Sequence, residues 1–245
     1  MLSSLFLSGS CAIVLSAQPD TISTTDGPLK ITPIKHASLM LEFKNKIIHV
    51  DPWSEGDYTG LPKADLILIT DIHGDHMDPA KIKEVRKNNT VIVAPAAVAK
   101  TVTGAMVLNN GESKIVDGVP IEAVPMYNLV RGPRPGKLFH DKGRGNGYIL
   151  TLGGKRLYLS GDTECIPEMK ALKSIDIAFV CMNLPYTMPP EEAAECVKAF
   201  KPKIVYPYHY RGQGGFSDTQ KFKTLVNQGN ASMEVRLKDW YVGNK

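Results

Sequence analysis

Three apolar segments of the chain run directly into side chains that can bind a metal ion. Residues 64–70, ADLILIT, are followed at once by DIHGDH at 71–76. The segment LYLSGD ends in Asp162, and IVYPYH ends in His209. A continuous apolar run of this length is typical of a β-strand that is covered on both faces. Loops at the carboxyl ends of such strands are where open α/β folds place their chemistry, so the three ends are expected to form one site.

The rest of the chain predicts strands first, and alternating strands and helices later. Hairpins are expected at Asp117-Gly118 and at Gly153-Gly154, since paired turn residues separate two apolar runs in each case. Such an order favours an α/β architecture of packed sheets covered by helices. Three short strands are predicted over residues 30–53, and helices are predicted over residues 79–87, 190–200 and 218–226.

The first 28 residues differ from the rest. Residues 1–17 are small and apolar, and residues 18–28 are polar. The segment resembles the apolar region of a secretory signal with cleavage near Ala17, so export to the periplasm or medium is expected. A buried N-terminal helix in an uncleaved cytoplasmic protein is the alternative. We therefore predict an export segment and polar linker over 1–28 and one domain over 29–245, in which no further segment is long enough to span a membrane.

Composition excludes few classes of protein. The chain has 245 residues, of which 43% are hydrophobic and 22% charged, as expected for one globular domain. Its formal charge of +4 is scattered over the sequence, so a nucleic-acid partner is not indicated. The sequence gives no indication of the oligomeric state.

The four cysteines do not form a metal-binding or redox motif. None is paired at C-x-x-C spacing, which excludes a zinc finger and a thioredoxin-like site. Cys181 and Cys196 lie in apolar segments and are expected to behave as small core residues.

The segment TDIHGDH, residues 70–76, is the strongest chemical signal. A loop leaving a strand can bring Asp71, His73, Asp75 and His76 to one point. Imidazole and carboxylate together suit Zn²⁺, Mn²⁺ or Fe²⁺. The alternative is a turn rich in aspartate with solvated histidines, which the density of ligating side chains disfavours.

Several motifs in this order resemble a known family. DIHGDH, SGDT and YHY follow KHASLMLEF and IIHVDP, as in the metallo-β-lactamase superfamily. The opening stretch and VPMYN resemble its branch related to ascorbate-phosphate lactonase and similar metal-dependent hydrolases. The resemblance extends from about Leu29 to the C-terminus. It implies an αββα sandwich of two mixed sheets flanked by helices, with the metal site along one edge.

The resemblance also implies roles for individual residues. Asp71, His73 and Asp162 would hold one metal ion, and Asp162 would bridge to a second ion. That second ion would be held by Asp75, His76 and His209. With one or two divalent ions, Zn or Mn/Fe, the expected activity is hydrolysis of a small ester, lactone or phosphoester by metal-bound hydroxide, with Asp75 transferring a proton.

Two positions depart from the family motif. Asp71 stands where the motif has histidine, and as a harder ligand it favours Mn²⁺, Fe²⁺, Mg²⁺ or weaker zinc binding. Asn128 stands nearest the position of the motif's downstream histidine, and an amide oxygen is a poor ligand for a transition metal. His140 is the candidate to replace it, either as a ligand or as a substrate contact.

Other residues are expected to support the site or contact the substrate. Asp51 is expected to hold the distal N–H of a ligand histidine. His36 is equally consistent with supporting a ligand residue from behind and with ordinary packing. Tyr186 is a candidate wall of the pocket, and Arg211 is a candidate contact for an anionic group on a small-molecule substrate. The basic residues of the long loop are candidates for contact with the same anionic group: Arg131, Arg134, Lys137, Lys142 and Arg144.

Two other functions stay open from the sequence. A binding or scaffolding protein that has lost its chemistry would explain the replacements at positions 71 and 128. An oxygen-handling metal enzyme would also use carboxylates, but it would need a fuller set of carboxylates and histidines. The retention of Asp75, His76, Asp162 and His209 favours the hydrolase.

Overall fold

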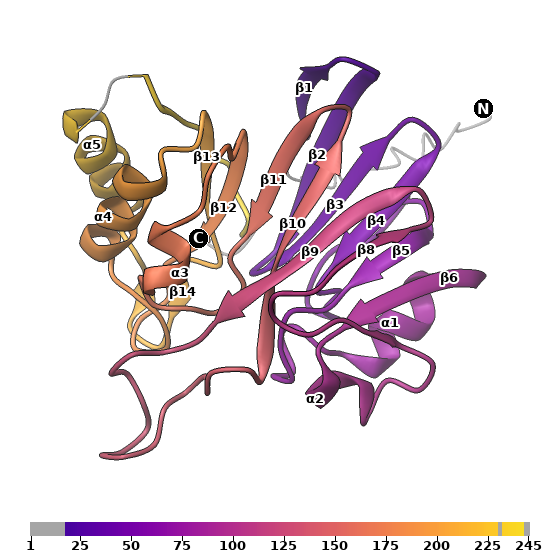
Figure 1. The fold of residues 1–245 in the computed structure, drawn as a ribbon, viewed down its shortest axis with the longest axis horizontal. Helices are drawn as coiled ribbons and strands as arrows, with labels where there is room; N and C mark the ends of the chain where they lie inside the picture. Colours follow the sequence, from indigo (N-terminus) through magenta and orange to yellow (C-terminus); the bar gives the residue numbers. More distant parts are fainter. Residues whose placement is uncertain (1–17, 230–231, 243–245) are drawn as a thin grey trace, which may run out of the picture.

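The protein folds as two facing β-sheets with helices on the outer side of each (Figure 1). The computed structural model describes residues 18–229 and 232–242, so the predicted export segment at 1–17 lies outside the described residues. This four-layer arrangement is the αββα sandwich that the resemblance implied, and the predicted fold class is confirmed.

The first sheet has seven strands in the order of the chain. Its first four strands pair antiparallel, and the last four pair parallel. The strands are β1 (Asp20–Thr24), β2 (Gly27–Lys35), β3 (Ser38–Phe43), β4 (Lys46–Val50), β5 (Ala64–Leu68), β6 (Arg86–Ala94) and β7 (Met106–Val107).

The second sheet also has seven strands and also mixes the two pairings. In spatial order they are β16 (Glu234–Val235), β13 (Ile204–Tyr208), β12 (Ile177–Cys181), β11 (Lys155–Leu159), β10 (Gly145–Leu152), β9 (Val119–Met126) and β8 (Ser113–Val116). The predicted hairpins join β8 to β9 and β10 to β11. A separate small hairpin pairs β14 (Arg211–Gly212) with β15 (Gly215–Phe216).

Helices cover both sheets on the outside (Figure 1). The first helix starts at Pro79 because the Asp78 carboxylate accepts hydrogen bonds from the backbone N–H groups of Ala80 and Lys81. It ends at Val85, two residues earlier than predicted, because β6 begins at once. The helices are α1 (Pro79–Val85) and α2 (Ala96–Ala99) beside the first sheet, and α3 (Pro167–Lys170), α4 (Pro190–Phe200) and α5 (Thr219–Gly229) beside the second.

Strand β5 and the residue after it show why residues 66–69 are all apolar. Leu66 and Leu68 belong to the core that includes the space between the sheets, whereas Ile67 and Ile69 pack with Ile82 of α1 on the other face. Because successive side chains of a strand point to opposite faces, a strand covered on both sides needs apolar residues at every position.

One predicted boundary is wrong. Residues 18–28 were expected to be a polar linker, but residues 20–24 form β1 and pair with residues 27–31 of β2. Polar residues are tolerated there because β1 is an edge strand with one open side. The described domain therefore begins before Leu29.

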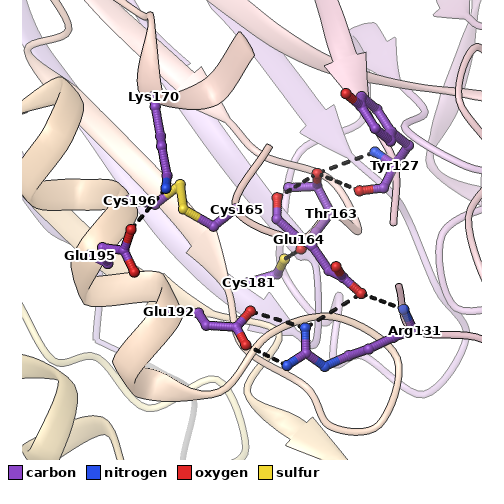
Figure 2. The surroundings of a disulfide bond; sticks show 10 residues. All are labelled: Tyr127, Arg131, Thr163, Glu164, Cys165, Lys170, Cys181, Glu192, Glu195 and Cys196. Atoms are coloured by element: carbon purple, nitrogen blue, oxygen red, sulfur yellow. Dashed lines mark hydrogen bonds and ion pairs between the residues drawn. A yellow bond between two sulfur atoms is a disulfide. The ribbon is translucent and has the colours of Figure 1, made fainter. Parts of the chain in front are cut away.

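A disulfide ties α4 to the loop that follows β11. Cys165 and Cys196 are bonded across a sequence separation of 31 residues (Figure 2). The sequence alone gave no pairing, because cysteines that meet only through the fold have no recognisable spacing. Cys181 is a buried free cysteine, as expected, whereas Cys196 was expected to be a small core residue and is instead bonded to Cys165.

Removing this disulfide should lower the free energy of unfolding. Closing a loop of 31 residues restricts the unfolded chain, and the chain-entropy model gives about 3–4 kcal/mol. We expect the Cys165→Ser/Cys196→Ser variant to show this loss in urea unfolding followed by circular dichroism. Dithiothreitol should destabilise the wild type by a similar amount and leave the double variant unchanged. An equal response of both proteins to the reductant would contradict the prediction.

Candidate metal centre

Side chains that could hold a metal ion gather at the edge where strands from both sheets end, in two main clusters. A third group, His36, Asp75 and His209, shares His209 with one of them. The Asp71 cluster consists of Asp71, His73 and His140, and the His76 cluster consists of His76, Asp162 and His209. Within each cluster the candidate donor atoms lie within 4.8 Å of one another. The three strand ends predicted to converge, after β5, β11 and β13, therefore do meet.

The His76 cluster has the spacing of ligands that share one ion. His76 Nε2 lies 3.4 Å from Asp162 Oδ2 and 3.2 Å from His209 Nε2. His209 Nε2 is also 3.4 Å from Asp162 Oδ1 and 3.3 Å from Asp75 Oδ2. Donor atoms about 2.1 Å from a tetrahedral Zn²⁺ are separated by about 3.4 Å. The observed separations fit that geometry.

The Asp71 cluster adjoins the first through Asp162. His73 Nδ1 lies 2.9 Å from Asp71 Oδ2, and His140 Nε2 lies 3.9 Å from the same oxygen. His140 Nε2 is 3.3 Å from Asp162 Oδ2, which is also the oxygen that faces His76. Asp162 thus stands between the clusters, where a bridging carboxylate would stand.

A glycine places Asp162 at this point. Gly161 has a φ of +60°, and a Cβ there would lie 2.4 Å from Met126 Sδ and 3.1 Å from the Asn146 carbonyl oxygen. Only glycine combines this backbone conformation with such close neighbours.

Asp51 orients His76. The imidazole Nδ1 lies 2.8 Å from Asp51 Oδ2, and a carboxylate can only accept, so Nδ1 carries the proton. The other ring nitrogen of His76, Nε2, therefore faces Asp162 and His209 in the cluster. The backbone N–H of Thr70 donates to Asp51 Oδ1 at 2.7 Å, and both acidic and imidazole side chains are fully buried. The contact expected of Asp51 is present.

Asn128 orients His140 in the way that Asp51 orients His76. Its Oδ1 lies 2.5 Å from His140 Nδ1, while its Nδ2 donates to Glu164 Oε1 and to the carbonyl of Tyr186. These two acceptors fix the orientation of the amide, so Oδ1 accepts from His140 and leaves Nε2 unprotonated. Asn128 therefore lies behind His140, whose Nε2 faces Asp162 and Asp71.

His36 holds His209. Their Nδ1 atoms are 2.9 Å apart, and the Tyr241 hydroxyl lies 3.2 Å from His36 Nδ1. Burial, followed by the charge of His209, lowers the pKa of His36 to about 3, so its neutral ring can accept the proton of His209. His36, Asp51 and His209 all have positive φ, near 45–50°, a conformation that costs energy in residues other than glycine. Three of the seven described non-glycine residues with positive φ therefore lie at this site.

The carboxylates of the site are held in their ionised form. Burial alone would raise the pKa of Asp71, but the hydrogen bond and charge of His73 lower it to about 2. The pKa of Asp162 likewise falls well below its ordinary value, because the charges of His209 and His76 outweigh its burial. For His76, burial lowers the pKa, but the charges of Asp162, Asp75 and Asp51 raise it well above its usual range. Buried, ionised carboxylates make this edge attractive to a cation.

Two buried atoms test whether the residues fit a metal ion. Eight buried side-chain atoms of the described residues find no hydrogen-bond partner, and His140 Nε2 and Asp162 Oδ1 are two of them. Unpaired polar atoms in the interior are costly, and both of these atoms belong to the clusters. A divalent cation would satisfy them, so the donor set fits the implied group.

A cavity of about 330 Å³ opens over the clusters. Phe139 and Tyr186 form one wall, with their rings in edge contact at 5.1 Å between centroids. The cavity is lined by His73, Asp75, Phe139, His140, Asp162, Asn183 and Tyr186. Tyr186, which the sequence offered as a candidate wall of the pocket, therefore lines this cavity.

The basic residues singled out in the sequence contact other groups. Arg211 lies over the ring of Phe216 at 5.9 Å and is not among the residues that line the cavity. Arg131 pairs with Glu192 of α4, and Lys142 pairs with Glu168 of α3. Arg134 and Lys137 line a separate hollow on the loop, and Arg144 pairs with Asp71.

Sequence reasoning missed Glu164. This buried side chain accepts from the backbone N–H groups of Leu129, Val130 and Arg131, and so holds the start of the long loop against the segment after Asp162. Figure 2 shows Glu164 between Arg131 and the disulfide-bonded segment. An acidic residue two positions after Asp162 was the available signal.

Two facing mixed sheets with histidine and aspartate clusters along one edge define the metallo-β-lactamase fold. Residues 30–209 match the family model described as the β-lactamase superfamily domain. The chain belongs to this superfamily, and within it to the class of metal-dependent hydrolases.

Similar proteins agree with this assignment. A metal-dependent hydrolase of Pelotomaculum thermopropionicum is 31% identical over 223 residues, which covers 85% of this chain and 96% of the relative. A crystal structure from Parabacteroides distasonis, assigned as a metal-dependent hydrolase, has a TM-score of 0.80 at 46% identity and covers 91% of this chain and 98% of that one. A metallo hydrolase of Ignicoccus hospitalis has a TM-score of 0.70 at 26% identity and covers 85% of this chain and 94% of that one.

In the described part of the chain, no helix has the length and apolar character needed to cross a membrane.

Replacing Asp51 should weaken metal binding without removing a donor atom. In Asp51→Asn the side chain keeps its size but loses its charge, and its single oxygen can no longer accept from both Thr70 N–H and His76 Nδ1–H. Loss of such a partner typically costs 10–100-fold in metal affinity, so we expect a drop of about that size in calorimetric titration with Zn²⁺. Asp65→Asn, which changes an aspartate paired with Lys87 away from the site, is the matched control. Equal affinities in Asp51→Asn and the control would contradict the role of Asp51.

Proposed function

We propose that the protein hydrolyses a small ester or lactone, with divalent ions held by the two clusters. The observation that carries this proposal is the coincidence of tetrahedral donor spacing, unpaired buried donor atoms and an adjoining cavity. A protein that kept only the fold would not need His76, Asp162 and His209 at ligand distances from one another. Catalysis therefore explains the site better than scaffolding does.

Asp162, His76, His209 and Asp75 would hold one ion, and Asp71, His73, His140 and Asp162 a second. When bound, such ions lower the pKa of a coordinated water toward neutrality and polarise a substrate oxygen. We infer zinc or Mn²⁺/Fe²⁺, since imidazoles suit all three metals and the carboxylate of Asp71 favours the harder ions. These ligand assignments are the ones expected from the motif, with His140 added.

The protein's own side chains supply proton transfer and substrate orientation. Asp75 lines the cavity, and its pKa lies below the ordinary aspartate value because the charge of His76 and the hydrogen bond to His209 outweigh its burial. An ionised carboxylate at the cavity wall can accept a proton from the nucleophile and return it to the leaving group. The Phe139–Tyr186 wall offers apolar surface to the body of the substrate.

The charge of the cavity favours a carboxylic ester or lactone over a phosphoester. Among the described residues, those that line the cavity include no lysine or arginine. Recognition of a phosphoryl group usually employs such cations. A phosphoester or another anionic substrate would need the exposed basic residues of the loop, Arg134 and Lys137, to move toward the cavity, and it is the second choice.

Metal content and turnover should be lost together in His76→Ala. Plasma mass spectrometry of the purified protein should find metal in the wild type and at least one equivalent fewer in the variant. Turnover of 4-nitrophenyl acetate or of a γ-lactone should fall by more than about 100-fold, since a ligand matters at least as much as its supporting partner. A chelator should abolish turnover and added Mn²⁺ or Zn²⁺ should restore it.

His49→Gln is the matched control, because His49 contacts the carbonyl of Pro62 and belongs to neither cluster. Wild-type protein without metal after repletion would refute the proposed function. Faster turnover of bis-4-nitrophenyl phosphate than of any ester or lactone would instead reassign the substrate.

We also propose that the protein is exported. The support comes from the apolar segment at 1–17 and from the disulfide, because stable disulfides form mainly in oxidising compartments. Intact-mass analysis of the protein recovered from periplasm or medium should show a chain that starts near residue 18. Recovery of the uncleaved chain from the cytoplasm alone would contradict export.

A further inference from the structure

The Arg144 guanidinium donates two hydrogen bonds to the Asp71 carboxylate. Its Nε lies 3.1 Å from Asp71 Oδ1, and its Nη2 lies 2.9 Å from Oδ2. The aspartate is fully buried and the arginine side chain is 17% exposed. Paired contacts of this kind fix the plane of the carboxylate as well as its charge.

The backbone sets the position of this pair. The N–H of Asn146 donates to the Thr70 carbonyl at 2.9 Å, which holds the start of β10 against the residue before Asp71. A Cβ at Gly145 would lie 2.8 Å from that same carbonyl oxygen and 2.6 Å from Met126 Cε, so no other residue fits there without a shift. Arg144 therefore leaves the chain directly beside Asp71.

Asp71 Oδ2 also faces the other donors of its cluster. It accepts from Arg144 Nη2 and lies 2.9 Å from His73 Nδ1 and 3.9 Å from His140 Nε2. A carboxylate oxygen has two lone pairs, so one can accept from the guanidinium while the other is available to a metal ion. Arg144 and a metal ion can thus contact Asp71 at the same time.

The charges explain why an arginine is needed. The superfamily motif has neutral imidazole at position 71, whereas aspartate adds one negative charge and Arg144 adds one positive charge. We propose that the Asp71–Arg144 pair acts as a single neutral ligand that replaces the histidine, with Arg144 as the residue that positions it. The inference rests on the proposed function because it requires an ion at the Asp71 cluster, and it goes beyond it by assigning Arg144.

The pair can be tested by exchanging it for the residue it replaces. Calorimetric titration with Zn²⁺ and with Mn²⁺ would measure stoichiometry and affinity for wild type, Asp71→His and Asp71→His/Arg144→Gln. Asp71→His leaves an uncompensated guanidinium beside the ion, so we expect at least 100-fold weaker binding of one of two equivalents. The double variant restores neutrality and should bind that equivalent within about tenfold of the wild type.

Arg144→Lys gives a second measurement that does not depend on the aspartate variants folding. Lysine keeps the charge but cannot form the paired contact, so affinity for the same equivalent should fall by about 10–100-fold. Arg156→Gln, which breaks the pair between Arg156 of β11 and Glu122 of β9, is the control and should bind as the wild type does.

Each outcome separates this inference from the proposed function. A single equivalent per chain that is lost in His76→Ala and unchanged in all three Arg144 and Asp71 variants would overturn the neutral pair while leaving the hydrolase intact. Binding in Arg144→Lys within twofold of the wild type would overturn the positioning role. No metal in any variant or in the wild type would overturn both proposals.

Discussion

The structure depends on keeping three carboxylates ionised at a buried edge between two sheets. Asp71, Asp75 and Asp162 meet the imidazoles of both clusters, and five of the six histidines in the chain lie there. Charges removed from water are costly unless each has a partner. The surrounding side chains supply those partners: Asp51, Asn128 and His36 set the imidazole tautomers, and Arg144 balances Asp71. The loops beyond the strands are arranged around this one requirement.

The fold brings these residues to one edge because the parallel strands of each sheet have their carboxyl ends on the same side. Asp51, Asp71, Asp162 and His209 all follow the last residue of a strand by one to three positions. The long loop then needs only to bring His140 over the edge, and Glu164 holds the beginning of that loop in place. The disulfide between Cys165 and Cys196 joins the segment that carries Glu164 to α4 (Figure 2).

Much of this could be predicted from the sequence, because the signals were local. Apolar runs identified doubly covered strands, and the residues at their ends identified Asp71, His73, His76, Asp162 and His209, which the structure brings together in the two clusters. The remainder depends on contacts between distant segments. The partners of Arg144, Asn128 and Cys165 lie 73, 12 and 31 residues away, and nothing in their local sequence names those partners. Strand β1 was missed for a different reason: an edge strand can be polar, so its sequence does not differ from that of a linker.

Gly161 has a consequence for how this site can change over generations or in the laboratory. Its side-chain position is already filled by Met126 and by the backbone of Asn146. A library that randomises the donors and the loop would explore new metals and substrates, but one that includes position 161 would lose most of its members to misplacement of Asp162. A residue that takes no part in the chemistry thus limits which variants of the site keep Asp162 in place, because its side chain is a single hydrogen atom.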